Sequence, residues 1–523
     1  MRLTNRLSIL IFIWALPVLV WAQFDYHHSA HIYPKGADGF RSEFVFGDAG
    51  SHGALVAQMS KWNTQLSLNN YGTFDIGLFP SINPAGPEIT PLFSVGHKSS
   101  IIALEADQNT AYVGIRWADS LVVADSLLDI ADQWTPTNMV LAWDLQDNKI
   151  LWTKSLNALQ DFTLSSSGEL IVLTSYPGSS ALLTLGAQGV QLDSTFIDNA
   201  LSGHLDLDQN DNRYISGLAS GYDTVKVGSF SHYSGGSGLN VFALKVSPNG
   251  EGQWFQSSTD VNYAFPFIRC DELGHVWLTG ELFQQQIWGN HTLAGSQWVY
   301  DFFLVKMDTS GTIEGAWETP NNTSITGDYR LASRQPIARS DSGVVLMLTN
   351  RGGVPFNGTL PLGGTTSPQD RGITFLEFQD GYTRGITYGT TSNSYITASG
   401  LQPSWSNTAM IWGAGLSYSD TLHCHTAAYS LDSIYTDVLG LIQLSSNISV
   451  YENPDITRIL YPNPTSGQIH ASPAWEEKER CEVRDLRGTL LYEGHPENWS
   501  AEHLPKGLYI LKVGSEVHRI IVK

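Results

Sequence analysis

Residues 205–217 read Leu205-Asp-Leu-Asp-Gln-Asn-Asp-Asn-Arg-Tyr-Ile-Ser-Gly217, and residues 268–280 repeat the pattern as Ile268-Arg-Cys-Asp-Glu-Leu-Gly-His-Val-Trp-Leu-Thr-Gly280. Each stretch has an apolar run, a turn centred on aspartate, a second apolar run and a glycine. Two β-prone runs separated by turn residues predict a β-hairpin. Weaker copies of this hairpin pattern occur at residues 104–116, 162–174, 337–349 and 408–415. Self-similarity of this kind indicates a repeat protein.

A second type of hairpin follows the first. Residues 240–255 match residues 301–317, since both have an apolar run, a turn ending in glycine and a tryptophan. Looser relatives of this second hairpin occur at residues 76–95, 139–152 and 373–388. Two hairpins make one four-stranded sheet, and such sheets repeated every few tens of residues are typical of β-propeller blades.

The repeats resemble a bacterial β-propeller repeat with Asp-x-x-Gly-Asn-x-Tyr-x-x-Gly and Phe-x-x-Lys-x-Asp-x-x-Gly-x-x-x-Trp hairpins. Residues 205–257 and 268–317 match it best, although Asn212 interrupts the glycine turn of the first. We expect an all-β protein with a seven-bladed propeller over residues 23–444. Its seventh blade would combine residues 40–68 with residues 427–444, because a closed ring leaves no exposed edge strand. A six-bladed ring with an N-terminal extension is the alternative.

The C-terminal stretch has its own motifs: Tyr461-Pro-Asn-Pro-Thr-Ser-Gly467, Val483-Arg-Asp-Leu-Arg-Gly488 and Leu504-Pro-Lys-Gly-Leu-Tyr-Ile-Leu-Lys-Val513. Short strands separated by turns predict a small β-sandwich over residues 456–523, after a polar linker at residues 445–455. The stretch resembles the type A C-terminal sorting domain of the type IX secretion system of Bacteroidetes-type bacteria. The matching residues are Tyr461, Pro462, Asn463, Pro464, Gly467, Asp485, Gly488, Leu504, Pro505, Gly507, Tyr509 and Lys523.

This resemblance implies an immunoglobulin-like sandwich and a partner, the type IX secretion machinery. It also implies a protein that is secreted or held at the outer cell surface. Sorting domains of this family are usually removed after export, so we expect cleavage in the linker at residues 445–455.

The N-terminus has the features of a secretory signal peptide. Arg2 and Arg6 precede an apolar run at residues 7–20, and small residues precede a cleavage site between Ala22 and Gln23. The run is shorter than the roughly 20 apolar residues that a spanning helix needs, and we expect no transmembrane segment. The two ends of the chain therefore agree on export through the periplasm.

Composition and charge narrow the function classes. With 49 glycines and 15% charged residues, the chain has the composition of a β-rich protein with many turns. The formal net charge is −21. Nucleic acids and anionic membrane surfaces require a basic patch, so neither is an expected partner. The acidity suits solubility, and recognition of a cationic ligand is the alternative.

The first quoted turn has alternating oxygen-bearing side chains, as a calcium-binding loop does. An EF-hand loop needs glycine at its sixth position and glutamate at its twelfth. Asp211 and Gly217 occupy those positions here, so a plain hairpin turn is the favoured interpretation. The alternating residues are Asp206, Asp208, Asn210 and Asn212.

The cysteines and histidines give weak signals. There are three cysteines, Cys270, Cys424 and Cys481, so they cannot all pair within one chain. The periplasm permits a bridge between Cys270 and Cys424. His423 and His425 share one face of a strand, but two ligands do not make a zinc site. Further ligands would have to come from His27, His28 and His31, and we expect no metal and no cofactor.

Tryptophans fall into two groups. Trp152, Trp254 and Trp317 recur at equivalent hairpin positions, which indicates packing between blades. The others are candidate contacts for a sugar ligand: Trp117, Trp134, Trp288, Trp298 and Trp405. The sequence contains no Gly-x-Ser-x-Gly, no His-Glu-x-x-His and no phosphate-binding glycine loop.

Three functions remain open. The first is a non-enzymatic module that binds an extracellular polysaccharide or protein, the second a propeller hydrolase or lyase acting on extracellular polysaccharide, and the third an adhesin-like scaffold. A carboxylate or histidine cluster at the channel would favour the enzyme, and a flat aromatic patch would favour the binding module. The secretion class also implies O-glycosylation at Asp-(Ser/Thr)-apolar sites, on at least one of Ser120, Ser126, Thr224, Thr421 and Ser433.

Overall fold

The computed structural model describes an almost entirely β-stranded chain. The described residues are 28–35, 43–49, 54–62, 72–79, 89–130, 136–236, 238–258, 266–282, 284–295, 301–318, 329–340, 343–351, 371–379, 382–390, 395–403, 409–417, 421–424, 427–430, 435–443, 459–461, 470–472, 480–484, 490–495, 499–513 and 516–522. Contacts divide the chain into two compact units, His27–Gln443 and a unit that contains the C-terminal strands.

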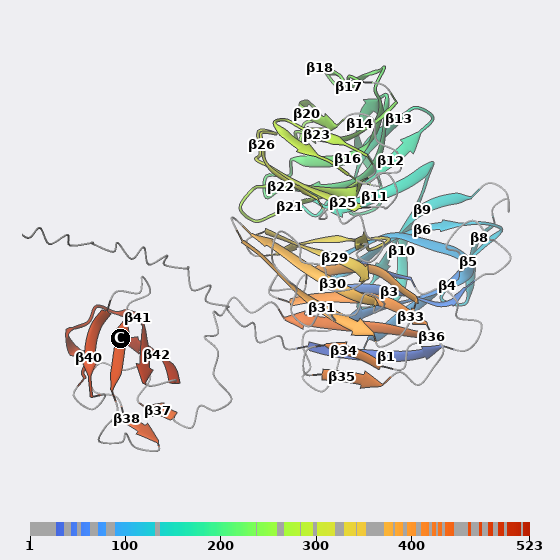
Figure 1. The fold of residues 1–523 in the computed structure, drawn as a ribbon. Helices are drawn as coiled ribbons and strands as arrows, with labels where there is room; N and C mark the ends of the chain where they lie inside the picture. The colour runs from blue at the N-terminus through green and yellow to red at the C-terminus, as the bar shows by residue number, and fades with distance from the viewer. Residues whose placement is uncertain are drawn as a thin grey trace, which may run out of the picture. The chain divides into compact units, whose positions relative to one another are not determined.

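The larger unit is built from four-stranded antiparallel sheets (Figure 1). Blade 1 is β2 (Phe44–Asp48), β3 (Ala54–Trp62), β4 (Gly72–Phe79) and the first half of β5 (Thr90–Ala106); blade 2 is the second half of β5 with β6 (Thr110–Trp117), β9 (Thr137–Asp144) and β10 (Lys149–Leu156). Blade 3 is β11 (Ala158–Leu164), β12 (Leu170–Tyr176), β13 (Ser179–Leu185) and β14 (Gln191–Asp198). Blade 4 is β15 (Ala200–Leu207), β16 (Arg213–Ser220), β19 (Leu239–Val246) and β20 (Gly252–Ser258).

Three further blades complete the unit. Blade 5 is β21 (Phe267–Cys270), β22 (Val276–Leu282), β25 (Asp301–Met307) and β26 (Ile313–Glu318). Blade 6 is β28 (Ile337–Ser340), β29 (Gly343–Arg351), β30 (Arg371–Gln379) and β31 (Tyr382–Thr390), with β27 (Tyr329–Leu331) also paired to β29. Blade 7 is β32 (Tyr395–Pro403), β33 (Ala409–Ser417), β36 (Tyr435–Gln443) and β1 (His28–Lys35).

The first strands of the blades form a closed ring. In order, β2, the second half of β5, β11, β15, β21, β28 and β32 each lie against the next, and β32 lies against β2. The approach is close where blades 1 and 2 meet, since a Cβ at Gly47 would lie 2.2 Å from the carbonyl oxygen of Leu104. The unit is therefore a seven-bladed β-propeller, as the repeats predicted.

The strand that closes the ring differs from the expected one. Residues 40–68 were expected in the seventh blade, but they supply β2 and β3 of blade 1. Instead β1 pairs with β36 along its whole length, from His28 opposite Ile442 to Lys35 opposite Tyr435. In Figure 1 the blue β1 lies beside the orange propeller strands β34, β35 and β36. The predicted hairpin at residues 408–415 was also wrong, because these residues fall largely within the single strand β33.

Apolar side chains fill the spaces between neighbouring blades. The cluster between blades 3 and 4 includes Leu173, Leu205 and Phe242, all almost fully buried. The recurrent tryptophans also reach into the next blade, as their spacing predicted. The indole nitrogen of Trp152 donates to the carbonyl of Ala187 at 2.8 Å, and that of Trp254 to Thr309 at 3.0 Å. Trp317 packs on Phe378 of blade 6 at 5.9 Å between ring centroids.

Extra hairpins cover the outer strands of several blades. Each is inserted between the second and third strands of one blade and leans on the outermost strand of the blade before it. Three of them form strand pairs there: β7 to β5, β17 to β14 and β34 to β31. The hairpins are β7 (Ser120–Val123) with β8 (Ser126–Ile130), β17 (Thr224–Val227) with β18 (Phe230–Tyr233), β23 (Gln286–Trp288) with β24 (His291–Leu293), and β34 (Thr421–Cys424) with β35 (Ala427–Ser430).

The smaller unit has a separate core. Its described strands are β37 (Ile459–Tyr461) with β38 (His470–Ser472), and a four-stranded sheet of β40 (Leu490–Gly494), β39 (Cys481–Arg484), β41 (Gly507–Val513) and β42 (Glu516–Val522). A short 3-10 turn occupies Ala501–His503. Trp499, Tyr509 and Leu511 are buried in its core. These described strands do not establish an immunoglobulin-like sandwich, which stays a prediction.

Candidate functional site

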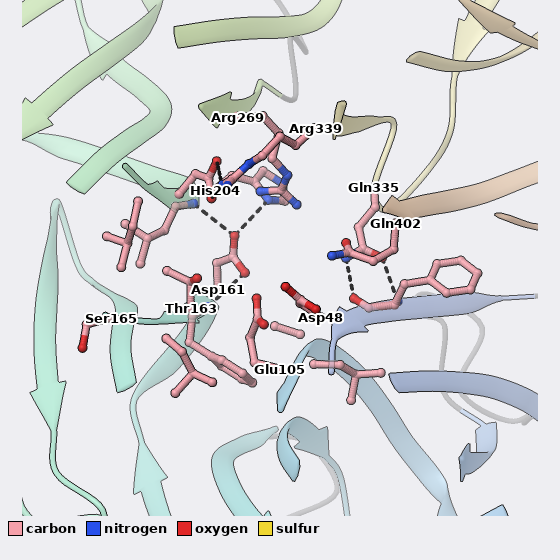
Figure 2. Close-up of a pocket in the computed structure, with 18 of the residues that line it drawn as sticks. Asp48, Glu105, Asp161, Thr163, Ser165, His204, Arg269, Gln335, Arg339 and Gln402 are labelled. Carbon is pink, nitrogen blue, oxygen red and sulfur yellow. Dashed lines mark hydrogen bonds and ion pairs between the residues drawn. The ribbon is translucent and has the colours of Figure 1, made fainter. Parts of the chain in front are cut away.

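A cavity of about 380 Å³ lies at the centre of the ring, enclosed by the innermost strands of all seven blades. Figure 2 shows its polar side chains turned inward. The charged and amide groups come from β2 (Asp48), β5 (Glu105), β11 (Asp161), β15 (His204 and Asp206), β21 (Arg269), β28 (Arg339) and β32 (Gln402), with Arg334 and Gln335 from the segment before β28.

Strand alternation explains why these polar residues face the cavity. Successive side chains of a strand point to opposite sides. Leu205 and Leu207 are buried between blades, so the intervening Asp206 projects into the channel. Ile268 and Cys270 are buried in the same way around Arg269.

Asp208 and Asp271, two positions after Asp206 and Arg269, stabilise the hairpin turns. Asp208 accepts hydrogen bonds from the backbone of Asn210 and Asn212, at 2.8 and 3.0 Å, and from the hydroxyl of Tyr214 at 3.0 Å. Asp271 binds its own turn in the same way. The residues considered for calcium therefore diverge: Asp206 turns to the channel while Asp208 closes the hairpin, which agrees with the plain-turn interpretation.

Two channel carboxylates also form hydrogen bonds with the backbone of the next blade. Asp161 accepts from the backbone nitrogen of Leu205 at 3.0 Å, and Asp206 accepts from that of Cys270 at 2.7 Å. Asp206 also lies 3.3 Å from a guanidinium nitrogen of Arg339. The nearby Asp206 carboxylate raises the pKa of Arg339, so this guanidinium is charged.

Glu105 is in a different situation. It makes no hydrogen bond or ion pair with any side chain that the structure describes. Burial raises the pKa of its carboxyl well above the ordinary value, Asp48, Asp161 and Asp206 add to the rise, and Arg269 opposes it. Glu105 can therefore hold a proton under conditions in which an exposed glutamate has lost it.

Arg269 is the basic counterpart of Glu105. The one hydrogen bond recorded for its guanidinium group, within the described residues, is to the carbonyl of Ile268 at 3.2 Å. The guanidinium carries five N–H donors in total. Most of its hydrogen-bonding capacity is therefore directed at the channel.

A histidine and an aspartate form a pair on the channel wall. His204 Nδ1 lies 3.4 Å from Asp161 Oδ2, and the imidazole packs at a tilt against Phe267, with 4.1 Å between ring centroids. Both contacts restrict the orientation of the imidazole ring. A carboxylate at one ring nitrogen leaves the other nitrogen available for proton exchange with a ligand.

The segment before β28 joins blade 6 to blades 1 and 2 through side chains. Arg334 pairs with Glu43 and donates to the hydroxyl of Ser100 at 3.2 Å. The Gln335 amide donates to the carbonyl of Phe46 at 2.6 Å and accepts from its N–H at 2.8 Å. Figure 2 shows this pairing as two dashed lines at the edge of the cavity.

Of the channel residues, the sequence analysis named only Asp206, as a calcium candidate, although Glu105, Arg269 and Arg339 also lie inside the quoted repeats. Glu105, Asp206 and Arg269 each stand one position before a buried residue and its turn aspartate or equivalent. Their shared position was a usable signal. Their proximity to one another follows only from ring closure.

The tryptophans proposed for ligand contact do not line the channel where they can be placed. Trp117 and Trp288 are both 0% exposed, so neither ring offers a face to a ligand. Trp134, Trp298 and Trp405 lie outside the described residues. Exposed apolar side chains of blade 4 and its inserted hairpin include Leu201, Tyr222, Tyr233 and Leu239.

The remaining candidates are placed as follows. Cys270 and Cys481 are free, buried thiols, so Cys270 is not bridged to Cys424 in this structure. The His423 side chain and His425 are outside what is described, as are Ala22 and Gln23. In the sorting motif, Leu504 is half-buried against the core, and Tyr509 donates to the carbonyl of Pro505 at 2.7 Å. Gly507 begins β41, Tyr461 ends β37, and the described residues do not include Pro462, Asn463, Pro464, Gly467, Asp485, Gly488 and Lys523.

Comparison with known families identifies the C-terminal unit. Residues 459–523 match the family described as "Secretion system C-terminal sorting domain". The chain therefore carries a type IX sorting tail, which implies export to the cell surface or outside. Within the described residues, no helix has the length and apolar composition needed to cross a membrane. No curated protein matches the chain.

Solved structures similar to the chain include other propellers. The Dos1 propeller is 9% identical, with 80% of this chain and 96% of that chain covered at a TM-score of 0.36. A protein from Lactobacillus plantarum is 12% identical over 76% and 99% of the two chains, at 0.35. The β-propeller domain of the Trilobed protease from Pyrococcus furiosus is 8% identical over 64% and 96%, at 0.30. The blade count rests on the strand pairing of this chain itself.

Proposed function

We propose that this chain is exported through the periplasm by the type IX machinery and acts outside the cell as a non-enzymatic binding module. Its target is an extracellular polymer or protein, and the central channel receives a small molecule or the end of a chain. The observation that supports this is the cavity itself, with polar side chains from all seven blades converging on it.

The size and chemistry of the cavity suit this role. Small-molecule sites typically enclose about 300–1,000 Å³ and hold a few convergent polar groups. The channel, at about 380 Å³, lies within that range. It has room for a small molecule or a chain end but not for a folded protein. Any wider contact with a polymer would involve the outer surface, where Tyr222 and Tyr233 are exposed. Trp134, Trp298 and Trp405 remain proposed contacts.

An uncharged substitution that fills the cavity tests whether the channel is the binding site. Thr163 lines the cavity, and Thr163→Trp would fill it without altering its charges. The secreted protein would be screened by calorimetry against soluble oligosaccharides and short peptides. We expect at least one compound to bind, with at least tenfold weaker binding to Thr163→Trp than to Ser231→Trp on the exposed face of β18. Equal binding by both folded variants would contradict the proposal.

A second candidate function is a hydrolase or lyase acting on extracellular polysaccharide. The His204–Asp161 pair favours it, because an imidazole oriented by a carboxylate is suited to general-base catalysis. Glu105, whose carboxyl pKa is raised by burial and neighbouring carboxylates, would supply an acid in the same cavity. Release of new reducing ends or unsaturated sugars from a polysaccharide panel, lost in His204→Gln, would establish this activity in place of simple binding.

A further inference from the structure

Charge is segregated around the channel. The neighbouring strands β2, β5 and β11 carry Asp48, Glu105 and Asp161, whereas β21 and β28 carry Arg269 and Arg339. In a ring of seven, the second strand faces the fifth and sixth across the centre. Glu105 therefore stands opposite the two arginines, as Figure 2 also shows.

Part of this charge is already balanced within the protein. Asp206 pairs with Arg339, and Asp161 accepts from Leu205 and lies beside His204. Glu105 and Arg269 face the cavity without a side-chain partner among the residues that the structure describes. Each can gain a charged partner from a ligand, because Arg269 keeps unused N–H donors and Glu105 can give up its proton to become a carboxylate. The two opposed and unsatisfied groups therefore indicate the kind of ligand that would complete the site.

We propose that the channel binds a small dipolar molecule, an amino acid or a short peptide. Its ammonium group would lie against Asp48 and Glu105, and its carboxylate against Arg269 with Arg339 beside it. This inference rests on the proposed function, in which the channel is the binding site, and names the chemical class of its ligand.

Both walls contribute to selectivity. A polyamine would bring positive charge to Arg269, and a dicarboxylate would bring negative charge to the acidic wall, so each is rejected at one end. A carboxylate suits arginine because the planar guanidinium binds it through two parallel hydrogen bonds. A zwitterion satisfies both walls at once.

A ladder of glycine peptides tests the charge separation. Glycine, diglycine and triglycine carry the same two charges at increasing distance. We expect calorimetry on the secreted protein to show binding of at least one of the three. N-acetylglycine, which lacks the ammonium, and glycinamide, which lacks the carboxylate, should each bind at least tenfold more weakly. Equal binding of either blocked form would overturn the proposal.

Variants assign the two ends. Arg269→Gln should weaken the best peptide at least tenfold and leave glycinamide unchanged. Glu105→Gln should weaken the best peptide and leave N-acetylglycine unchanged. Asp198→Asn, at an exposed position of β14 in the propeller, is the control and should bind like the parent. Suppose that both variants have the thermal midpoint of the parent but each also loses the blocked ligand that it should still bind. That result would contradict the assigned orientation.

Proton release gives an independent readout. Glu105 holds a proton more tightly than an ordinary glutamate, and an ammonium group placed beside it would favour loss of that proton. Calorimetry in buffers of different ionisation enthalpy should show protons released on binding, and Glu105→Gln should abolish the release. Binding with no proton released by the parent chain would contradict the placement of the ammonium.

The ligand class and the proposed function can fail separately. If none of the glycine series binds but an oligosaccharide does, and Thr163→Trp loses it, the channel is a binding site and the dipolar ligand is wrong. If no compound in either panel binds, both the dipolar ligand and the proposed binding function of the channel are wrong.

Discussion

At the scale of single residues, the turn aspartates Asp107, Asp208 and Asp271 stabilise the first hairpins of blades 2, 4 and 5. Burial pushes the pKa of Asp208 upward, but hydrogen bonds from Asn212, Asn210 and Tyr214 outweigh it and leave the pKa below the ordinary value. The ionised carboxylate therefore stabilises the folded state at neutral pH. This stabilisation is lost as the pH falls through the lowered pKa.

We expect Asp208→Ala to lower the free energy of unfolding by about 2 kcal/mol at pH 7, because several donors lose their acceptor. Chemical denaturation at pH 7 and at pH 3 measures the effect, which should shrink at the lower pH. Asp147→Ala is the control, since Asp147 is exposed and pairs with Lys149 on the surface. A difference between the two variants that stays constant with pH would contradict this account.

Glu105 has the opposite pH dependence. Its pKa is raised in the folded protein, so stability falls as the pH rises above the ordinary value of 4.5, where the unfolded chain loses its proton first. Glu105→Gln should match the parent chain near pH 4 and become the more stable of the two as the pH rises toward 7. Thermal unfolding across that range tests the sign, and a variant less stable than the parent at pH 7 would refute it.

At this scale the sequence predicted structure better than it predicted the site. Trp152 and Trp254 were assigned correctly to packing between blades because their recurrence reflects a local hairpin position. Glu105 and Arg269 face each other only because the ring closes over more than 300 residues. No local pattern carries that information, so the cavity had to be seen in the structure.

At the scale of the element, the inserted hairpins explain a pattern that was taken for a modification signal. Asp119-Ser-Leu and Asp223-Thr-Val open β7 and β17, where Leu121 and Val225 are fully buried. The motif therefore recurs in part because each hairpin places an apolar residue in the core. Ser126, on the exposed strand β8, is the most accessible acceptor among those described.

If the protein is O-glycosylated, we expect the sugar on Ser126 rather than on Ser120 or Thr224. Mass spectrometry of peptides from the native host provides the measurement. A Ser126→Ala variant should lose the mass of that glycan and keep its thermal stability. Sugar on Ser120 with Ser126 bare would reverse this ranking.

The strand that closes the ring could not be identified from local sequence. β1 contains Pro34 and two histidines, a composition unlike that of a buried strand. It lies outermost in blade 7, and the outer strand of a sheet tolerates proline and polar residues. Residues 40–68 were predicted for blade 7 because they are apolar. They are apolar because β2 and β3 are the two inner strands of blade 1.

Removing β1 should therefore destabilise the whole ring. A chain that begins at Gly36 leaves β36 as an open edge strand, which favours association with other chains. We expect its thermal midpoint to fall by about 10 °C or more, as a loss of several kcal/mol implies, and oligomers to appear in size-exclusion chromatography. A chain that begins at His27 keeps β1 and is the control. Equal midpoints for the two chains would show that β1 does not close the ring.

At the scale of the whole molecule, the two compact units have separate cores. Such units usually fold independently when few contacts cross their linker. Deleting residues 456–523 should leave a folded, protease-resistant propeller that is retained in the periplasm. Fusing those residues to an unrelated periplasmic protein should send it outside. Normal amounts of the deletion variant in the medium would show that the tail is dispensable for export.

One strand of the propeller sets a limit on how the chain can be rearranged. β5 runs without interruption from the outer edge of blade 1 to the inner wall of blade 2, with Ser99 paired to both Gly72 and Trp117. Circular permutation succeeds where new termini fall in exposed loops. The next two blade boundaries give such places at the exposed Asn157 and Asn199, whereas the first boundary lies within a strand. Blades 1 and 2 must therefore be duplicated, exchanged or excised together, and new ends at Ser99 would cut two sheets at once.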